Sequence, residues 1–369
     1  MNGNEKLMKH SIAQKMIVQI VPVVLIIFIA LTVISILMSG SSEKKLAYDA
    51  ASQMAANYAN SFDVKMSINQ SIGRTLSYVM AGYQAANREE TLLVIRGLVD
   101  KNPGILGAYV GYEPNAFDGK DKVYANQSGH DQTGRFIPYW NRLTGIMTLD
   151  PLADYETSDY YLIPKNTKSD SVIEPYLYQG VLMTSYISPI LDKSGNFLGI
   201  AGVDVSLNDL DAEVSKIKVF DSGYALLVSN TTIFVSAPDK DLIGQKTLAD
   251  FAKEKNNPQL EKIAEEILAG KTGYIQTTDP FNNKAVTMFF APVQTGHWSL
   301  IVVAPDVEML AGVNQLRLTL IIACLIGILL MSILIWFIAT RLTGPIVAIS
   351  KAADQIASGD LDLALQIRD

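Results

Sequence analysis

The sequence predicts an α+β protein in which two modules of antiparallel sheet follow a long N-terminal helix, with a transmembrane helix on either side. Two apolar stretches, at residues 17–38 and 318–338, contain no charged side chain. Each is longer than the roughly 18 to 20 apolar residues that an α-helix needs to cross a bilayer. Between them the order of strands, helix and strands occurs twice, which favours two similar modules over one large domain.

The charges beside the apolar stretches predict their orientation. Lys6, Lys9 and Lys15 precede the first stretch, and Arg341 follows the second. The positive-inside rule therefore places both ends in the cytoplasm and the region between them outside the cell. A cleaved signal peptide is the alternative for the first stretch, but its apolar run exceeds the roughly 7 to 15 residues of such peptides and lacks their small-residue cleavage site. We expect a multi-pass plasma membrane protein in contact with lipid.

The region after the first span is predicted to be a helical stalk. Apolar residues recur at spacings of three and four from residue 42 to about residue 99, with no proline, which predicts one long helix with at most one break. Pro103 marks a change of pattern, after which Asp, Gly and Asn separate short β-rich runs. These runs are 105–112, 135–140, 181–190 and 197–205.

A β-hairpin is the clearest feature of the first β-rich block. Residues 186–191 and 197–205 alternate as strands around the turn 192–196, where Gly195 can adopt the positive φ that the turn requires. A polar helix from Ser206 to about Lys216 leads into the second block. That block is predicted to contain strands 223–228, 233–236, 273–277, 285–292 and 298–303, with a helix at 258–269.

The segment after the second span predicts a cytoplasmic helix. Pro345 lies just beyond the span, where it is expected to end one helix and begin the next. An amphipathic pattern follows and stops at residues 359–361. Its apolar positions are Ile346, Ile349, Ala353 and Ile356.

Composition excludes several classes of function. The net charge of −7 and pI near 5.1 argue against nucleic acid as a partner, because phosphate binding needs a basic face. Cys324 is the only cysteine, and His10, His130 and His297 lie in different regions, so neither a disulfide nor a metal site is expected. No nucleophile or phosphate-loop motif is present, so we expect neither an enzyme nor a cofactor.

Two segments resemble known signalling families. Residues 344–361 resemble the first helix of a HAMP domain, the signal converter of chemoreceptors and sensor kinases. The segment between the spans resembles a double Cache sensor, in which two PAS-like modules of antiparallel sheet stand on a long helix. The residues that carry this second resemblance are 172–176, 184–189, 192–195, 199–207, 223–228, 242–244 and 295–305.

The resemblance implies a methyl-accepting chemotaxis type of receptor that is truncated within its HAMP domain. The implied organisation is a cytoplasmic N-terminus (1–16), a transmembrane helix (17–38), a stalk helix (39–102), a membrane-distal Cache module (103–215), a membrane-proximal Cache module (216–310), a second transmembrane helix (317–339) and a partial HAMP domain (340–369).

The resemblance also implies where a ligand binds. In the amino-acid-binding branch of the family, a strand Asp of the distal module binds the ligand amine, and an Arg near a Trp-Tyr pair binds its carboxylate. Asp204 matches the first position, but the stretch 158–164 that corresponds to the second has no arginine. A ligand α-carboxylate would lack its bidentate partner there, unless Arg135 or Arg142 supplies the charge from a neighbouring strand.

Asp204 is the leading candidate site residue because it interrupts the apolar strand 199–205. A buried carboxylate is costly unless it is paired, and an amine-bearing ligand would pair it, with cation–π attraction from nearby aromatic rings. The alternative is an internal partner, such as a backbone amide, a tyrosine hydroxyl or an arginine. The candidate ligand-binding residues are Asp204, Arg135, Tyr139, Trp140, Tyr160, Tyr161 and Tyr186.

These inferences predict a transmembrane chemoreceptor for an extracellular small molecule, acting as a homodimer whose helical stalk has two conformations. Two other classes share the same features. One is the input half of a sensor histidine kinase or cyclic-nucleotide enzyme, and the other is a stand-alone membrane-anchored binding protein. A signalling output module is expected to lie outside this chain.

Overall fold

The computed structural model describes residues 3–357, which form two compact units. One unit runs from Tyr48 to Met309 and contains both sheets. The other comprises the described residues before Tyr48 and after Met309, and it is helical.

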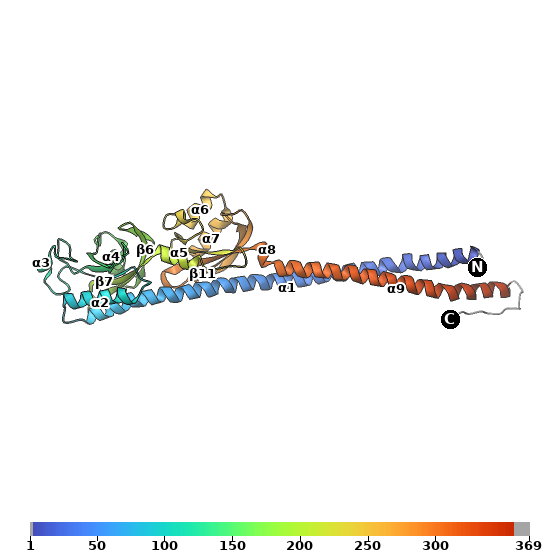
Figure 1. Ribbon diagram of the computed structural model, residues 1–369, viewed down its shortest axis with the longest axis horizontal. Helices are drawn as coiled ribbons and strands as arrows, with labels where there is room; N and C mark the ends of the chain where they lie inside the picture. The colour runs from blue at the N-terminus through green and yellow to red at the C-terminus, as the bar shows by residue number, and fades with distance from the viewer. Residues whose placement is uncertain (1–2, 358–369) are drawn as a thin grey trace. The chain divides into compact units, whose positions relative to one another are not determined.

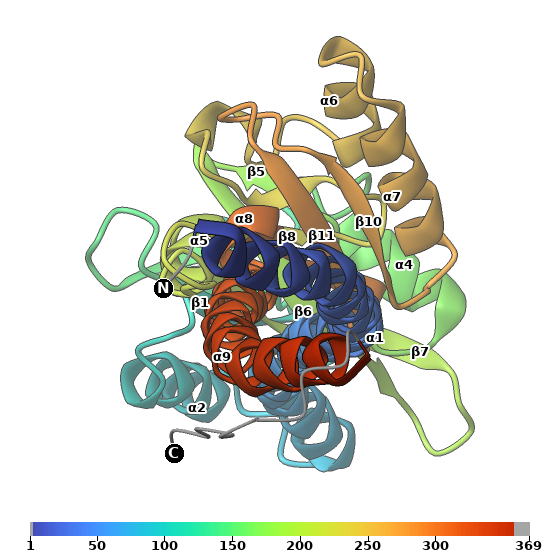
Figure 2. The same ribbon diagram turned by 90° about the vertical axis from the view of Figure 1, so that its right-hand side faces the viewer.

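Two helices have the length and composition of membrane spans. The most apolar window of α1 (Gly3–Gly82) has a mean hydropathy of 3.2, and that of α9 (Ala311–Ala357) has one of 3.0. Only 0% and 6% of the residues in these windows are buried, so their apolar side chains are free to face lipid. The two helices lie side by side (Figure 2). They pack together at Gly327, where a Cβ would come within 2.7 Å of the Phe28 ring.

The prediction that Pro345 ends a helix is wrong, because α9 continues through it. Proline restricts the residue before it, but that residue is Gly344, which has no Cβ to clash. Thr343 also donates its hydroxyl proton to the carbonyl of Ala339, one turn earlier. Residues 359–361, the predicted end of the HAMP-like helix, lie outside the described residues.

The predicted stalk helix is present with one break. After α1 ends, α2 begins at Arg88 and runs to Lys101. Asn87 caps α2, because its side-chain oxygen accepts the backbone N–H groups of Glu89 (3.0 Å) and Glu90 (3.3 Å). The break turns the chain back along the stalk, so that α1 and α2 cover the same sheet.

The first sheet is antiparallel throughout and has the strand order β3-β2-β1-β7-β6-β4, with β5 also paired to β6. Its strands are β1 (Gly107–Tyr112), β2 (Pro138–Asn141), β3 (Thr148–Pro151), β4 (Ser171–Val172), β5 (Tyr176–Tyr178), β6 (Val181–Leu191) and β7 (Phe197–Ser206). The helices of this region are α3 (Asp121–Tyr124), α4 (Asp159–Thr167) and α5 (Leu207–Val214).

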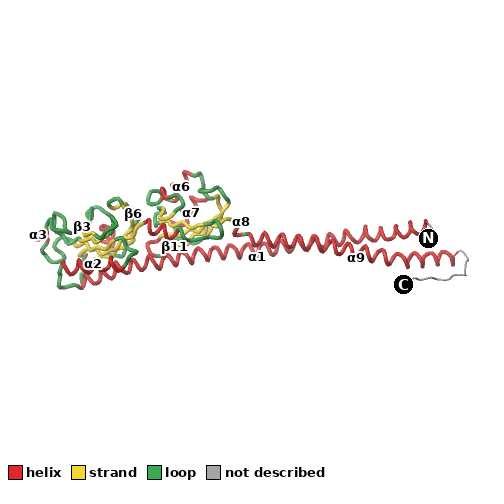
Figure 3. Tube along the Cα trace, viewed as in Figure 1, coloured by secondary structure: helices red, strands yellow, loops and turns green. Residues whose placement is uncertain are grey.

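The second sheet has the order β10-β11-β12-β8-β9. Its strands are β8 (Tyr224–Val228), β9 (Phe234–Ser236), β10 (Gly273–Thr278), β11 (Ala285–Val293) and β12 (Trp298–Pro305). Its helices are α6 (Leu248–Glu254), α7 (Pro258–Leu268) and α8 (Asp306–Met309), with 3₁₀ turns η1 (Lys240–Leu242) and η2 (Thr295–His297). In each sheet the first strand pairs with the last, β1 with β7 and β8 with β12. Figure 3 shows the two groups of strands in yellow.

The predicted hairpin is present, with β6 and β7 paired antiparallel and Gly195 at φ 80° in the turn. Four α-helices were not predicted, α3, α4, α6 and α8. Each is short, and α4 contains Pro164, so none of them shows a sustained helical period in the sequence.

Helix α1 contacts both sheets (Figure 1). Toward its N-terminal side, Tyr48 accepts a hydrogen bond from Gln276 of β10. Further along, Gln70 donates to the carbonyl of Ile187 in β6 at 3.0 Å. Gly73 lets the helix approach β6 closely, since a Cβ there would lie 2.8 Å from a strand carbonyl oxygen. One helix therefore supports both sheets.

Candidate functional site

Asp204 lies in the centre of the first sheet, on β7 between β1 and β6. It pairs with Gly107 on one side and with Ser185 on the other, and it is 3% exposed. The Ser185 hydroxyl donates to its carboxylate at 2.6 Å. Because that uses the only proton of Ser185, the Tyr176 hydroxyl, 2.7 Å from Ser185 Oγ, must be the donor in the next link.

The charge of Asp204 is not neutralised by the protein. Among residues 3–357, no Arg, Lys or His forms an ion pair with it. Burial therefore raises the pKa of Asp204 to about 7, although Ser185 and nearby Tyr139 favour the ionised form. The Tyr139 hydroxyl faces this carboxylate without hydrogen-bond geometry. The site combines a buried carboxyl group with no cation.

Aromatic rings surround Asp204 on its face of the sheet. Tyr109 and Tyr139 lie two positions beyond the row of Asp204, so strand alternation places them on the same face. The Tyr109 ring meets those of Tyr139 and Tyr160 edge-on, with centroids 5.7 and 6.2 Å apart. We refer to the group as the Asp204 cluster. Its members are Asp204, Ser185, Tyr109, Tyr139, Tyr160, Tyr176 and Tyr178.

Two glycines give these rings their space. A Cβ at Gly107 would lie 2.5 Å from the Tyr139 ring, and one at Gly202 would lie 2.6 Å from the Tyr109 hydroxyl. The rings therefore lie against the backbone of the sheet itself. The hydroxyl groups of Tyr109 and Tyr139 are buried and have no hydrogen-bond partner within the described chain. These two hydroxyl groups could therefore form hydrogen bonds with a ligand.

Arg135 and Tyr161 form a separate polar group at the other end of this face. Arg135 donates to the Tyr112 carbonyl at 2.8 and 3.0 Å and to the Tyr161 hydroxyl at 2.9 Å, and Tyr161 donates to Glu113 at 2.6 Å. Tyr112 is five residues along β1 from Gly107, roughly 17 Å at strand spacing. Arg135 is therefore too distant to bind the carboxylate of an α-amino acid whose amine contacts Asp204.

Arg142, the other arginine considered from the sequence, donates to the carbonyl of Val99 in α2. Its guanidinium is part of the contact between α2 and the sheet. Neither arginine stands beside the Asp204 cluster.

Trp140 and Tyr186 lie on the opposite face of the sheet. Trp140 pairs with Ala108, and Tyr186 pairs with Val203, each one residue out of step with the row of Asp204. Their side chains consequently face α1 and α2, where Arg96 lies 5.2 Å over the Trp140 ring. The structure brings Asp204, Tyr139 and Tyr160 together and separates them from these two aromatics by the thickness of the sheet.

Four members of the cluster were not among the predicted site residues: Ser185, Tyr109, Tyr176 and Tyr178. Tyr109 lies on the predicted strand 105–112, but only the pairing of that strand with β7 places it on the face of Asp204. The other three depend on the register of β5 and β6, which no local pattern specifies.

The corresponding face of the second sheet has a different character. It carries an apolar core. Strand residues of this core are Leu226, Val228, Met288, Phe290, Ile301 and Val303. The buried carboxylate beside it, Asp279, lies outside the strands and accepts hydrogen bonds from the Tyr224 hydroxyl at 2.8 Å and from the backbone N–H of Phe281 at 2.9 Å. The two sheets share a topology, and of the two only the first has a carboxyl group on a central strand, Asp204.

Comparison with known proteins agrees with this architecture. A family profile described as Cache domain matches residues 40–313. The methyl-accepting chemotaxis protein TlpQ of Pseudomonas aeruginosa is 27% identical over 319 residues, covering 76% of this chain and 43% of TlpQ. The chain thus spans less than half the length of this curated relative. The methyl-accepting chemotaxis protein PscA of Pseudomonas syringae is 25% identical over 242 residues, covering 63% of this chain and 36% of PscA.

Solved structures show the same fold. The extracellular domain of mmHK1S-Z3, a proposed histidine kinase, is 49% identical with a TM-score of 0.70, and the match covers 74% of this chain and 99% of that domain. The profile match ends before the segment that resembles HAMP. The predicted resemblance to Cache sensors is confirmed, and the chain belongs to the Cache domain family.

Proposed function

We propose that this chain is the sensor part of a transmembrane chemoreceptor that binds a small amine-bearing cation at the Asp204 cluster. The observation that carries the proposal is a carboxylate, 3% exposed, without a cationic partner in the described chain. An ammonium group would supply the missing charge. The five tyrosine rings would add cation–π attraction, worth roughly 0.5 to 2 kcal/mol each when desolvated.

The arrangement favours an amine over an α-amino acid. Arg135 and Arg142, the two arginines considered from the sequence, bind elsewhere, and neither guanidinium is placed to hold the carboxylate of a ligand at Asp204 in the usual bidentate way. The free hydroxyls of Tyr109 and Tyr139 instead offer weak polar contacts to a hydroxyl or amide on the ligand. The ligand class is therefore a cation with little negative charge of its own.

The proposal continues from the sensor to the membrane. The two sheets act as two PAS-like modules, the first distal from the membrane and the second proximal, and α1 and α9 supply two spans. Both ends of the chain lie in the cytoplasm, where a HAMP domain relays the signal. Similarity to TlpQ supports a chemotaxis output.

The sensor half of a histidine kinase is the second candidate. Its support is the 49% identity with the extracellular domain of mmHK1S-Z3 over 74% of this chain. Both candidates use the same sensor and differ in the output module. The kind of output module distinguishes them, because a long helical hairpin belongs to the chemoreceptor and a phosphoacceptor histidine to the kinase.

A ligand screen tests the sensor function. The full chain in detergent is heated with primary, secondary and quaternary amines, amino acids, carboxylates and purines. An amine at about 100 times its dissociation constant should raise the unfolding free energy by roughly 2.7 kcal/mol. Asp204→Asn should abolish this shift, whereas Asp159→Asn, on an exposed helix end, should retain it. A shift by carboxylates alone, or an amine shift that survives Asp204→Asn, would contradict the proposal.

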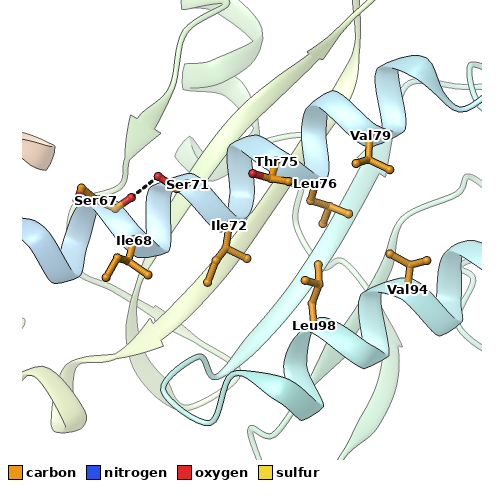
Figure 4. Close-up of a pocket in the computed structure, with 9 residues that line it drawn as sticks. All are labelled: Ser67, Ile68, Ser71, Ile72, Thr75, Leu76, Val79, Val94 and Leu98. Carbon is orange, nitrogen blue, oxygen red and sulfur yellow. Dashed lines mark hydrogen bonds between the residues drawn. The ribbon is translucent and has the colours of Figure 1, made fainter.

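A second copy of the chain is the proposed partner of a groove between α1 and α2. Its volume is about 400 Å³, and its lining has no charged side chain (Figure 4). Ile68, Val79 and Val94 are about half exposed along it. Uncharged surfaces can face their own copy without repulsion, and two stalks anchored in one membrane run parallel. The lining residues are Ser67, Ile68, Ser71, Ile72, Thr75, Leu76, Val79, Val94 and Leu98.

Ile68→Glu is expected to weaken this dimer, because it places a like charge in both copies of the groove. Sedimentation of the full chain in detergent should show a dimer for the wild type and a shift toward monomer for the variant. Ile146→Glu serves as the control, since Ile146 is an equally apolar, 68% exposed residue outside the groove. A variant that remains as dimeric as the wild type would exclude this interface.

A further inference from the structure

One short segment connects the Asp204 cluster to the second sheet. This segment, residues 171–178, which we name the strap, comprises β4, β5 and the three residues between them. Both strands pair with β6, yet the pairing slips between them. Val172 lies opposite Tyr186 and Tyr176 lies opposite Met183, so four steps of the strap match three steps of β6. The extra residue is a bulge, which breaks the rigidity of the ladder at this point.

One end of the strap belongs to the Asp204 cluster. The Tyr176 hydroxyl is joined through Ser185 to the Asp204 carboxylate by links of 2.7 and 2.6 Å. The Tyr178 hydroxyl accepts the backbone N–H of Ala153 at 2.9 Å. The Tyr176 ring also stacks on Tyr160 with a centroid distance of 6.3 Å. Any change in what Asp204 binds therefore acts directly on β5.

The bulge of the strap holds the second sheet. The Glu174 carboxylate accepts hydrogen bonds from the hydroxyls of Ser229 (2.5 Å) and Thr231 (2.6 Å), which lie in the turn between β8 and β9. Ser229 is fully buried. Val172 packs on Gly296 of η2, where a Cβ would come within 3.0 Å of its side chain. β8 pairs with β12, which leads into α8.

Two features would allow the strap to shift: an adjoining cavity and a buried acceptor without a hydrogen bond. A cavity of about 440 Å³ adjoins it. The lining residues are Ser67, Gln70, Ser71, Arg74, Ile163, Asp170, Ser171, Val172, Glu174, Asn230, Thr295, Gly296 and His297. The second carboxylate oxygen of Glu174, Oε1, is buried and has no partner among the described atoms. An unsatisfied buried acceptor raises the free energy of this arrangement, so a small displacement that satisfies it is favourable.

We propose that the strap is the mechanical link between the ligand site and the second sheet, with Glu174 as its transmitting contact. A cation that pairs with the Asp204 carboxylate weakens its hydrogen bond from Ser185. The hydrogen bond between Ser185 and Tyr176 then weakens as well. The strap shifts at its bulge, and Glu174 carries the shift to the turn between β8 and β9. The identity of the natural trigger rests on the proposed function, whereas the link itself is a property of the contacts between Asp204 and Ser229.

Hydrogen exchange of the full chain in detergent tests the link with two perturbations. One is saturating choline or ethanolamine, and the other is Asp204→Asn, which alters the cluster without any ligand. Each is applied to the wild type, to Glu174→Gln and to Thr231→Val. Glu156→Gln is the matched control, because Glu156 is an exposed glutamate of the same region whose side chain forms no hydrogen bond within the described residues. Peptides covering 176–186 report on the cluster, and peptides covering 229–236 report on the turn.

Without a second substitution, Asp204→Asn is expected to change hydrogen exchange in both groups of peptides. With Glu174→Gln, the cluster peptides should still respond, while the response of residues 229–236 should shrink by roughly two- to thirty-fold, the range of typical coupling energies. Thr231→Val should give a smaller loss. The link is refuted if the turn responds equally in Glu174→Gln, or if Asp204→Asn never reaches the turn. A failure of both amines to change any peptide would instead count against the amine ligand.

Discussion

Lowering the pH from about 8 to about 5 is expected to stabilise the ligand-free protein while weakening its binding of a quaternary amine. The folded-state pKa of Asp204 is about 7, above its ordinary value of 3.8. The folded state therefore binds the proton more tightly than the unfolded state does. The resulting contribution to the free energy of unfolding is full below the pKa that Asp204 has in the unfolded chain, and it is lost as the pH rises through 7. Between pH 8 and pH 5 the gain in the free energy of unfolding is on the order of 3 kcal/mol.

Binding follows the opposite direction, because a cation needs the ionised carboxylate. Below pH 7 the affinity should fall about tenfold per unit, or roughly 100-fold at pH 5. A quaternary amine keeps its own charge throughout this range. The tyrosines of the cluster do not interfere, since burial raises the pKa values of Tyr109, Tyr139 and Tyr176 well above 10 and the rings stay neutral.

The difference between the wild type and Asp204→Asn isolates this effect. Burial lowers the pKa of His130 below its ordinary value, so this residue makes the fold less stable as the pH falls. That contribution is common to both proteins and cancels. Urea unfolding and calorimetric binding at a series of pH values provide the two curves. Equal pH dependence of stability in both proteins would show that Asp204 does not carry the proton.

Arg88→Met is expected to lower the free energy of unfolding by about 3 to 5 kcal/mol, the largest loss of stability that we predict for one substitution. The Arg88 guanidinium is buried and donates to Asp118 at 2.8 and 2.9 Å, to Asp121 at 2.8 Å and to the carbonyl of Gly134 at 2.8 Å. Methionine preserves the apolar volume of the side chain but leaves two carboxylates buried without a cation.

Urea unfolding of the full chain measures this loss. Arg96→Met is the control, because Arg96 forms an exposed pair with Asp100 at 3.7 Å and a ring contact with Trp140. Its loss should cost less than about 1 kcal/mol. If Arg88→Met lowered the free energy of unfolding no more than the control does, the buried network of Arg88, Asp118 and Asp121 would not stabilise the fold. Arg88 also binds the carbonyl of Gly134, next to Arg135. The variant should therefore increase the mobility of Arg135, at the end of the sheet face away from the Asp204 cluster.

The sequence predicted the framework because its signals are local. Span length, the helical period of the stalk and the Gly195 turn each depend on a few neighbouring residues, and the structure contains all three. Pro345 shows the limit of this approach. A proline is a helix breaker on average, but Gly344 before it removes one of the steric reasons for a break, the clash with the preceding Cβ.

The site was harder to predict because it depends on register. Tyr139 and Trp140 are adjacent, and both were candidates, although neighbours on a strand point to opposite faces. Asp204 was found from its chemistry, as a carboxylate in an apolar strand. Ser185 and Tyr176, which contact it or its partner, are ordinary residues until β6 is aligned with β5 and β7.

Under the proposed function, the burial of Asp204 would also limit the rate of signalling. A group that is 3% exposed behind tyrosine rings cannot be reached by simple diffusion, so the rings would have to part before each arrival and each departure of a ligand. Association would then be slower than diffusion to an open site, and the residence time would reflect the opening rate of the aromatic wall. A receptor built this way would average brief fluctuations in ligand concentration and report the sustained level.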